Sequence, residues 1–103
     1  MSERIEKIMA AVKLRFPGEV WHLKSYPVKV GFGDQVNWEG VVETFHIPET
    51  NHSVRCYAWE YEKDTGTDYV TVPAIKLKSA PDVMTPVQAV QAWLSTLGPA
   101  DGV

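Results

Sequence analysis

The stretch S-V-R-C-Y-A-W-E-Y-E, residues 53–62, decides the fold that this sequence predicts. Two sets of side chains alternate along it, one small and apolar and one large with polar tips: Val54, Cys56 and Ala58 against Arg55, Tyr57, Trp59 and Tyr61. This period of two is typical of a β-strand, and a strand with both faces occupied usually lies inside a sheet. We therefore predict a central strand whose small residues pack under helices and whose rings face away from them.

The strand before it is predicted at residues 36–47. Placing His46 opposite His52 sets Glu43 beside Arg55, so that opposite charges meet across the pair. The same register sets a β-branched side chain, Val41, beside the aromatic Tyr57 and pairs Val42 with Cys56. Contacts of these kinds fix the register of a hairpin.

The strand after it begins beyond a short loop that contains Gly66, where a positive φ is expected. Pairing Lys63 with Thr67 brings Tyr61 next to Tyr69. On the opposite face the same register brings small residues together. Both predicted hairpins thus assign the same two faces to the central strand.

The remaining elements flank this core. Ser2 can cap a helix at residues 3–16, whose apolar residues recur at helical spacing. Residues 19–30 are typical of an edge strand, because Pro27 lacks a ladder donor, and a bulge near Tyr26–Pro27 would reconcile the parity of its apolar residues.

Thr85-Pro86-Val87-Gln88 begins a second helix with a capping box, and Gly98-Pro99 is expected to end it. The prediction is a single α+β domain over residues 1–103 with the order α-β-β-β-β-α. Its four strands should form an antiparallel meander, with both terminal helices packed on one face.

Composition narrows the classes of function. The chain has 103 residues and a net charge of −3, and residues 31–68 hold eight acidic and two basic groups. Nucleic acids and anionic membranes select for clustered basic residues, so we expect neither as a partner. The single cysteine, Cys56, fits a reducing compartment, and no apolar run suits a signal peptide or a membrane span. We expect a cytoplasmic protein without a cofactor.

The expected functional surface is the open face of the sheet. It carries aromatic rings together with charged and β-branched residues: Arg55, Tyr57, Trp59, Tyr61, Tyr69, Val41, Glu39 and Glu43. Exposed rings of this kind mark protein interfaces. We expect a non-catalytic interaction domain that forms a homodimer or docks a protein partner. The alternative is a small-ligand-binding protein or minor enzyme that uses the same face, with Glu39 and Glu43 as the acid–base pair.

Histidines are the remaining candidates for chemistry. His46, His52 and His22 would meet at one end of the sheet if the first hairpin paired Val30 with Trp38. No H-x-x-x-H or C-x-x-C spacing supports a metal site, so we expect none. The pattern leaves loop or edge histidines as the simpler interpretation.

Overall fold

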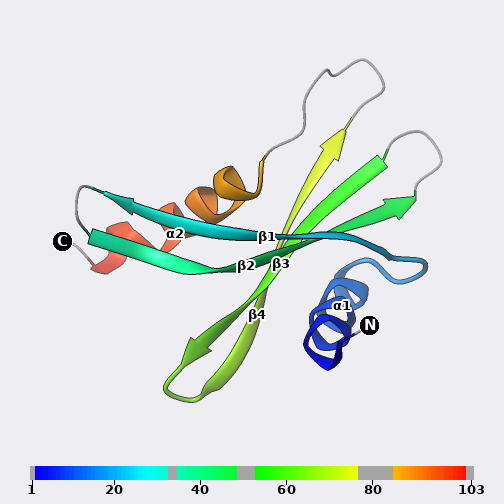
Figure 1. The fold of residues 1–103 in the computed structure, drawn as a ribbon, viewed down its shortest axis with the longest axis horizontal. Helices are drawn as coiled ribbons and strands as arrows, with labels where there is room; N and C mark the ends of the chain where they lie inside the picture. Colours follow the sequence, from blue (N-terminus) through cyan, green and yellow to red (C-terminus); the bar gives the residue numbers. More distant parts are fainter. Residues whose placement is uncertain (1, 33–34, 49–52, 77–84, 102–103) are drawn as a thin grey trace.

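The computed structural model of the protein describes residues 2–32, 35–48, 53–76 and 85–101. Its elements follow one another as α1 (Glu3–Arg15), β1 (Trp21–Phe32), β2 (Gln35–Pro48), β3 (Ser53–Lys63), β4 (Gly66–Lys76) and α2 (Pro86–Asp101) (Figure 1). The sheet is an antiparallel meander in the order β1-β2-β3-β4. The predicted fold class, element order and interior position of the central strand are confirmed.

Both helices begin with the predicted caps. The Ser2 hydroxyl accepts a hydrogen bond from the Ile5 amide at 3.2 Å. Thr85 and Gln88 form a reciprocal capping box, in which each side chain accepts from the other residue's amide, at 3.2 and 2.9 Å. The predicted stop at residues 98–99 is wrong, because α2 continues to Asp101. In the described parts of the chain, neither helix has the length and apolar character that a membrane span requires.

The hairpin turn between β3 and β4 is tighter than predicted. Lys63 pairs with Gly66, whose φ of 136° lies in the region that glycine favours. The register therefore differs by one residue from the expected one, and Tyr61 lies opposite Asp68. A shift of one residue moves a whole set of side chains to the other face. Tyr69 consequently packs on the side of α1.

The register between β2 and β3 also differs from the prediction, by three residues. Glu43 lies opposite Ala58, and His46 lies opposite Arg55. Because three is an odd number, β2 presents its other set of side chains to each face. Glu43 does not pair with Arg55 as expected. It faces α1 and forms an ion pair with Arg4 of that helix instead.

For the edge strand β1, some predictions are confirmed and one is wrong. Val30 pairs with Trp38 as considered from the sequence, and Pro27 lies on the outer strand of the sheet. The irregularities of the ladder lie between His22 and Lys24 and between Val30 and Gly31, not near Tyr26–Pro27.

The two helices cover opposite faces of the sheet, which corrects the prediction that both lie on one face. Under α1 the core holds Val54, Cys56 and Ala58 with Ile8 and Val12. Under α2 it holds a separate cluster: Val28, Val30, Val42, Tyr57, Trp59, Ala89 and Val90. If both helices lay on the small-residue face, Tyr57 and Trp59 would be exposed to water. Their exposure would cost about 2–3 kcal/mol for each ring, which is what the burial of an aromatic side chain is worth. The helix α2 removes that cost.

Candidate functional site

The candidate site lies where the sheet divides. The ladder between β2 and β3 runs from Pro48–Ser53 to Glu43–Ala58 and ends there. Beyond this point β2 remains paired with β1, and β3 with β4, so that two hairpins diverge (Figure 1). We call the space between residues 38–42 of β2 and 59–62 of β3 the fork.

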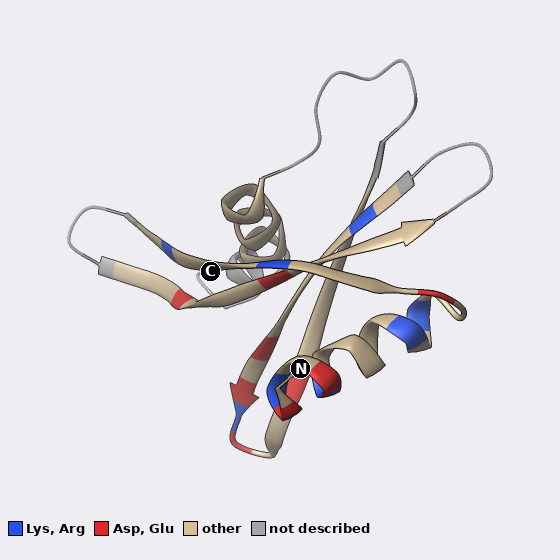
Figure 2. Ribbon diagram, turned by 45° about the vertical axis from the view of Figure 1, so that its right-hand side comes forward, with Lys and Arg blue, Asp and Glu red and all other residues tan. Residues whose placement is uncertain are grey.

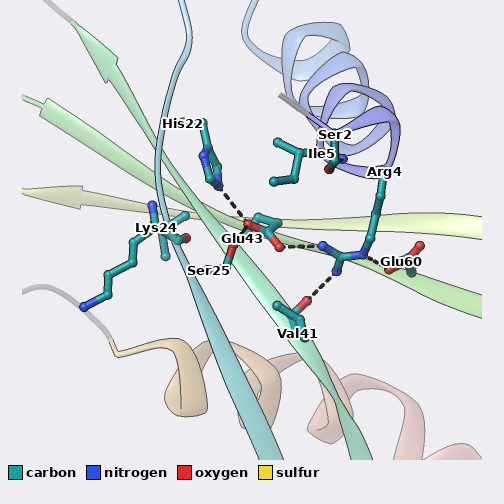
Figure 3. A network of polar contacts seen from close by, with 10 residues as sticks. Ser2, Arg4, Ile5, His22, Lys24, Ser25, Val41, Glu43 and Glu60 are labelled. Atoms are coloured by element: carbon teal, nitrogen blue, oxygen red, sulfur yellow. Dashed lines mark hydrogen bonds and ion pairs between the residues drawn. The ribbon is translucent and has the colours of Figure 1, made fainter.

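Arg4 of α1 closes the narrow end of the fork. Its guanidinium donates to the Glu43 carboxylate on β2 at 2.5 Å and to the Glu60 carboxylate on β3. A third hydrogen bond, of 2.9 Å, goes to the backbone oxygen of Val41 (Figure 3). One planar cation from the helix thus links the two strands at the point where they separate.

Glu43 is the buried centre of this network, with no exposed surface. Its Oε1 accepts from the Ser25 hydroxyl and from His22 Nε2, the latter at 2.8 Å (Figure 3). Burial by itself would raise the pKa of the Glu43 carboxyl, but hydrogen bonds from Ser25, Arg4 and His22 outweigh burial and hold the pKa below its ordinary value. The carboxylate therefore stays ionised and fully engaged.

The arrangement around Glu43 does not match a nucleophilic triad. In such a triad the histidine lies between the serine and the carboxylate. Here Ser25 and His22 both donate to the same carboxylate oxygen. Arg4 takes the other oxygen. The predicted acid–base pair of Glu39 and Glu43 is not brought together around an open position, because Glu43 is enclosed while Glu39 is exposed.

The wide part of the fork is an open hollow of about 470 Å³, lined by Trp38, Glu39, Gly40, Val41, Glu60, Tyr61 and Glu62. Its two rings belong to the α2 side, where Trp38 packs on Trp59 and Tyr61 packs on Trp93. Strand alternation places its carboxylates on the α1 side, with Glu60 on Arg4. Figure 2 shows acidic positions on both diverging strands. The hollow is thus aromatic toward one helix and acidic toward the other.

The aromatic side of the fork is held in place by a chain of ring contacts. Trp59 lies 5.7 Å from Trp38 and 5.6 Å from Trp93, between ring centroids, and Tyr61 lies 4.9 Å from Trp93. Gly40 leaves room for the Trp38 indole, since a Cβ atom at Gly40 would come within 2.8 Å of two of its carbons. The rings at the fork are therefore fixed before any ligand arrives.

The predicted binding face is divided by the observed structure. Tyr57 and Trp59 are buried under α2 and form no open surface. Tyr69 is half-buried against the α1 core, and Arg55 is exposed. Three members of the predicted set line the hollow together: Glu39, Val41 and Tyr61.

The two histidines that the structure describes, His22 and His46, have different partners. His22 donates to Glu43, whereas His46 stacks against Trp21 with ring centroids 5.4 Å apart. His52 lies outside the described residues. Among the residues that are described, no three His, Cys, Asp or Glu side chains form a metal-binding group. Cys56 is buried, and burial raises the pKa of its thiol to about 11, which leaves it protonated at neutral pH.

Three residues of the site, Arg4, Ser25 and Trp38, were not predicted from the sequence. For Arg4 a signal existed, because it precedes the buried Ile8 and Val12 at spacings of four and eight and so shares their face of the helix. Ser25 and Trp38 carry no comparable signal, since their roles depend on the β1–β2 register.

No protein-family model, curated protein or solved structure matches this chain. The interpretation of the site therefore rests on its own residues. These provide an enclosed ionic network that braces α1 to the sheet and, next to it, an open hollow with fixed rings and carboxylates.

Proposed function

We propose that this protein is a non-catalytic interaction domain that docks a segment of a protein partner in the fork. The observation that carries the proposal is the open hollow between two diverging strands, with Trp38 and Tyr61 fixed on one side. Tryptophan and tyrosine are the residues that most often dominate binding energy at protein interfaces.

The network around Glu43 supports a binding role over a catalytic one. A general base needs an accessible lone pair near its operating pKa. Both carboxylate oxygens of Glu43 already accept hydrogen bonds, from Arg4, Ser25 and His22, and the pKa of the carboxyl is lowered. Its contribution is to hold the narrow end of the fork together.

The burial of Tyr57 and Trp59 changes which partner the geometry favours. A homodimer through the sheet face required these rings to be exposed, and α2 covers them. A narrow fork suits an extended segment better than a second folded copy. The small-ligand alternative concerns the same hollow, whose volume lies in the range of ligand pockets.

Selection from a random twelve-residue peptide display library, followed by affinity measurements on synthetic peptides, tests the proposal. Gly40→Ala should weaken the selected peptides at least tenfold, because the added Cβ displaces the Trp38 indole without changing any charge. Leu14→Ser is the matched control, since Leu14 lies on α1, outside the hollow, and is 87% exposed. Thermal unfolding of each variant checks that the fold is retained.

Two results would overturn the proposal. One is that no peptide binds; the other is that selected peptides bind wild type and Gly40→Ala equally. Light scattering over a concentration series tests self-association separately. A dimer that Gly40→Ala dissociates would mean that a second copy occupies the fork, which would contradict the docking of a partner segment there.

A further inference from the structure

We infer that the segment docked in the fork is a β-strand in which apolar and basic side chains alternate. This inference rests on the proposed function and specifies the chemistry of the partner. It follows from three features of the fork: its strand edges, the difference between its two sides, and the cation already bound at its narrow end.

The first feature is a pair of strand edges that pair with no other strand among the described residues. Residues 36–42 of β2 pair with β1 on one side only, and residues 59–63 of β3 pair with β4 on one side only. Such an edge offers a row of backbone donors and acceptors to an added strand. Main-chain hydrogen bonds would then supply affinity, and the side chains on either side of the sheet would supply specificity.

The second feature is the difference between the two sides. An added strand points successive side chains toward opposite faces. On the α2 side they would meet Trp38 and Tyr61, whereas on the α1 side they would meet Glu39, Glu60 and Glu62. Apolar side chains suit the rings, and Lys or Arg suits the carboxylates. The required pattern therefore has a period of two.

The third feature is the guanidinium of Arg4. It shows that the fork accepts a cation between its strands, with contacts to Glu43, Glu60 and the Val41 oxygen. One cation leaves the carboxylates in excess, because Glu39 and Glu62 also line the hollow.

The other groups near these carboxylates leave them available. Lys29 lies across the ladder from Glu39, and among the described residues no ion pair joins the two. Glu62 accepts a hydrogen bond of 2.9 Å from the neutral hydroxyl of Thr67, and Lys63 pairs with Asp68. Glu39 and Glu62 are therefore the two positions at which a basic segment would gain most.

The test uses three end-blocked peptides of identical length, with binding followed by fluorescence anisotropy at 50 mM salt. The first alternates basic with apolar residues, as in T-K-V-R-I-K-T. The second replaces each Lys and Arg by Gln, and the third keeps the composition but places the basic residues together. We expect the second and third to bind at least tenfold more weakly than the first. Raising the salt to 500 mM should remove most of the difference between the first and second.

Variants of the protein locate the effect. The double variant Glu39→Gln/Glu62→Gln should weaken the alternating basic peptide at least tenfold and leave its Gln counterpart unchanged. The matched control, Glu6→Gln/Glu19→Gln, removes the same charge outside the hollow and should change neither. Glu60 is avoided because it holds Arg4.

Strand addition has a separate readout. Methylating alternate backbone nitrogens of the basic peptide, on the edge that pairs with the protein, should abolish binding, while methylating the other set should not. Amides on the fork edges of β2 or β3 should gain protection from hydrogen exchange on binding.

The outcomes separate the two proposals. If library-selected neutral peptides bind in a Gly40→Ala-sensitive way and the basic pattern gives no advantage, the docking function stands and this inference fails. If the basic peptide still binds whichever set of backbone nitrogens is methylated, strand addition is wrong. If no peptide of either kind binds, the docking function and this inference fail together.

Discussion

Replacing Glu43 by Gln should destabilise the protein strongly, because Glu43 is the buried centre of its network and has no exposed surface. The amide keeps one oxygen for His22 and Ser25 but loses the charge that strengthens both hydrogen bonds. Its NH₂ group then faces the Nη1 donor of Arg4, so that two donors meet where an ion pair stood.

The size of the effect follows from these contacts. Hydrogen bonds to charged groups are worth about 1 kcal/mol more than neutral ones, which gives about 2 kcal/mol for the two donors. The loss at Arg4 is smaller than for a fully enclosed pair, because its side chain is 33% exposed and keeps Glu60 and the Val41 oxygen. Adding about 1 kcal/mol for it gives a total of about 3 kcal/mol. For a chain of this size this lowers the melting temperature by about 12–24 °C.

Urea unfolding at pH 7, followed by tryptophan fluorescence, measures this loss. The matched control is Glu60→Gln, which removes the other carboxylate on Arg4 from a side chain that is 35% exposed. A surface pair of that kind should cost about 1 kcal/mol or less. If Glu43→Gln costs no more than Glu60→Gln, the network does not brace the fork as described.

Three further predictions concern pH, the thiol and the hairpin turn. The pKa of Glu43 in the folded state is lowered from 4.5, so its contribution to the free energy of unfolding is complete above pH 4.5 and is lost as the pH falls below that value. Wild type should therefore lose stability in acid more steeply than Glu43→Gln. Parallel slopes in urea titrations from pH 7 to 3 would contradict this. Cys56 is buried and the pKa of its thiol is raised to about 11, so a thiol-reactive dye at pH 8 should label it only when the protein unfolds, and rapid labelling of the native state would show an accessible thiol. Gly66→Ala should destabilise the protein by about 1–2 kcal/mol, because the positive φ strains any residue with a Cβ although the space around it is open; thermal unfolding beside Asp64→Ala measures this, and equal melting temperatures would argue against strain at the turn.

Most of the fold follows from local sequence signals. The caps at Ser2 and Thr85, the glycine turn and the alternation along β3 each depend on a few neighbouring residues, and all of them are observed. Strand register was harder to predict. The expected partner of Glu43 was Arg55, but Glu43 pairs instead with Arg4 of α1, which is 39 residues away from it in sequence. Local pairing rules do not include such a competitor.

The candidate site was only partly predictable for the same reason. The acidic and aromatic character of this region was visible in the sequence, and Glu39, Val41 and Tyr61 do line the hollow. Its location depends on where the β2–β3 ladder ends and on which face α2 covers. Neither can be read from residue spacing, since the large residues of β3 fit an exposed face and a face under a helix equally well.

The placement of the two helices also bears on how the chain folds during synthesis. The first helix lies against β2, β3 and β4, whereas the last one packs on β1 and on the rings of the central strand. The helices α1 and α2 therefore cover residues that are made much later and much earlier, respectively, on the ribosome. Until α2 has left the exit tunnel, a nascent chain would display Tyr57 and Trp59 to the surrounding medium, where a chaperone could hold them. Folding of this region should accordingly finish late, once α2 has emerged.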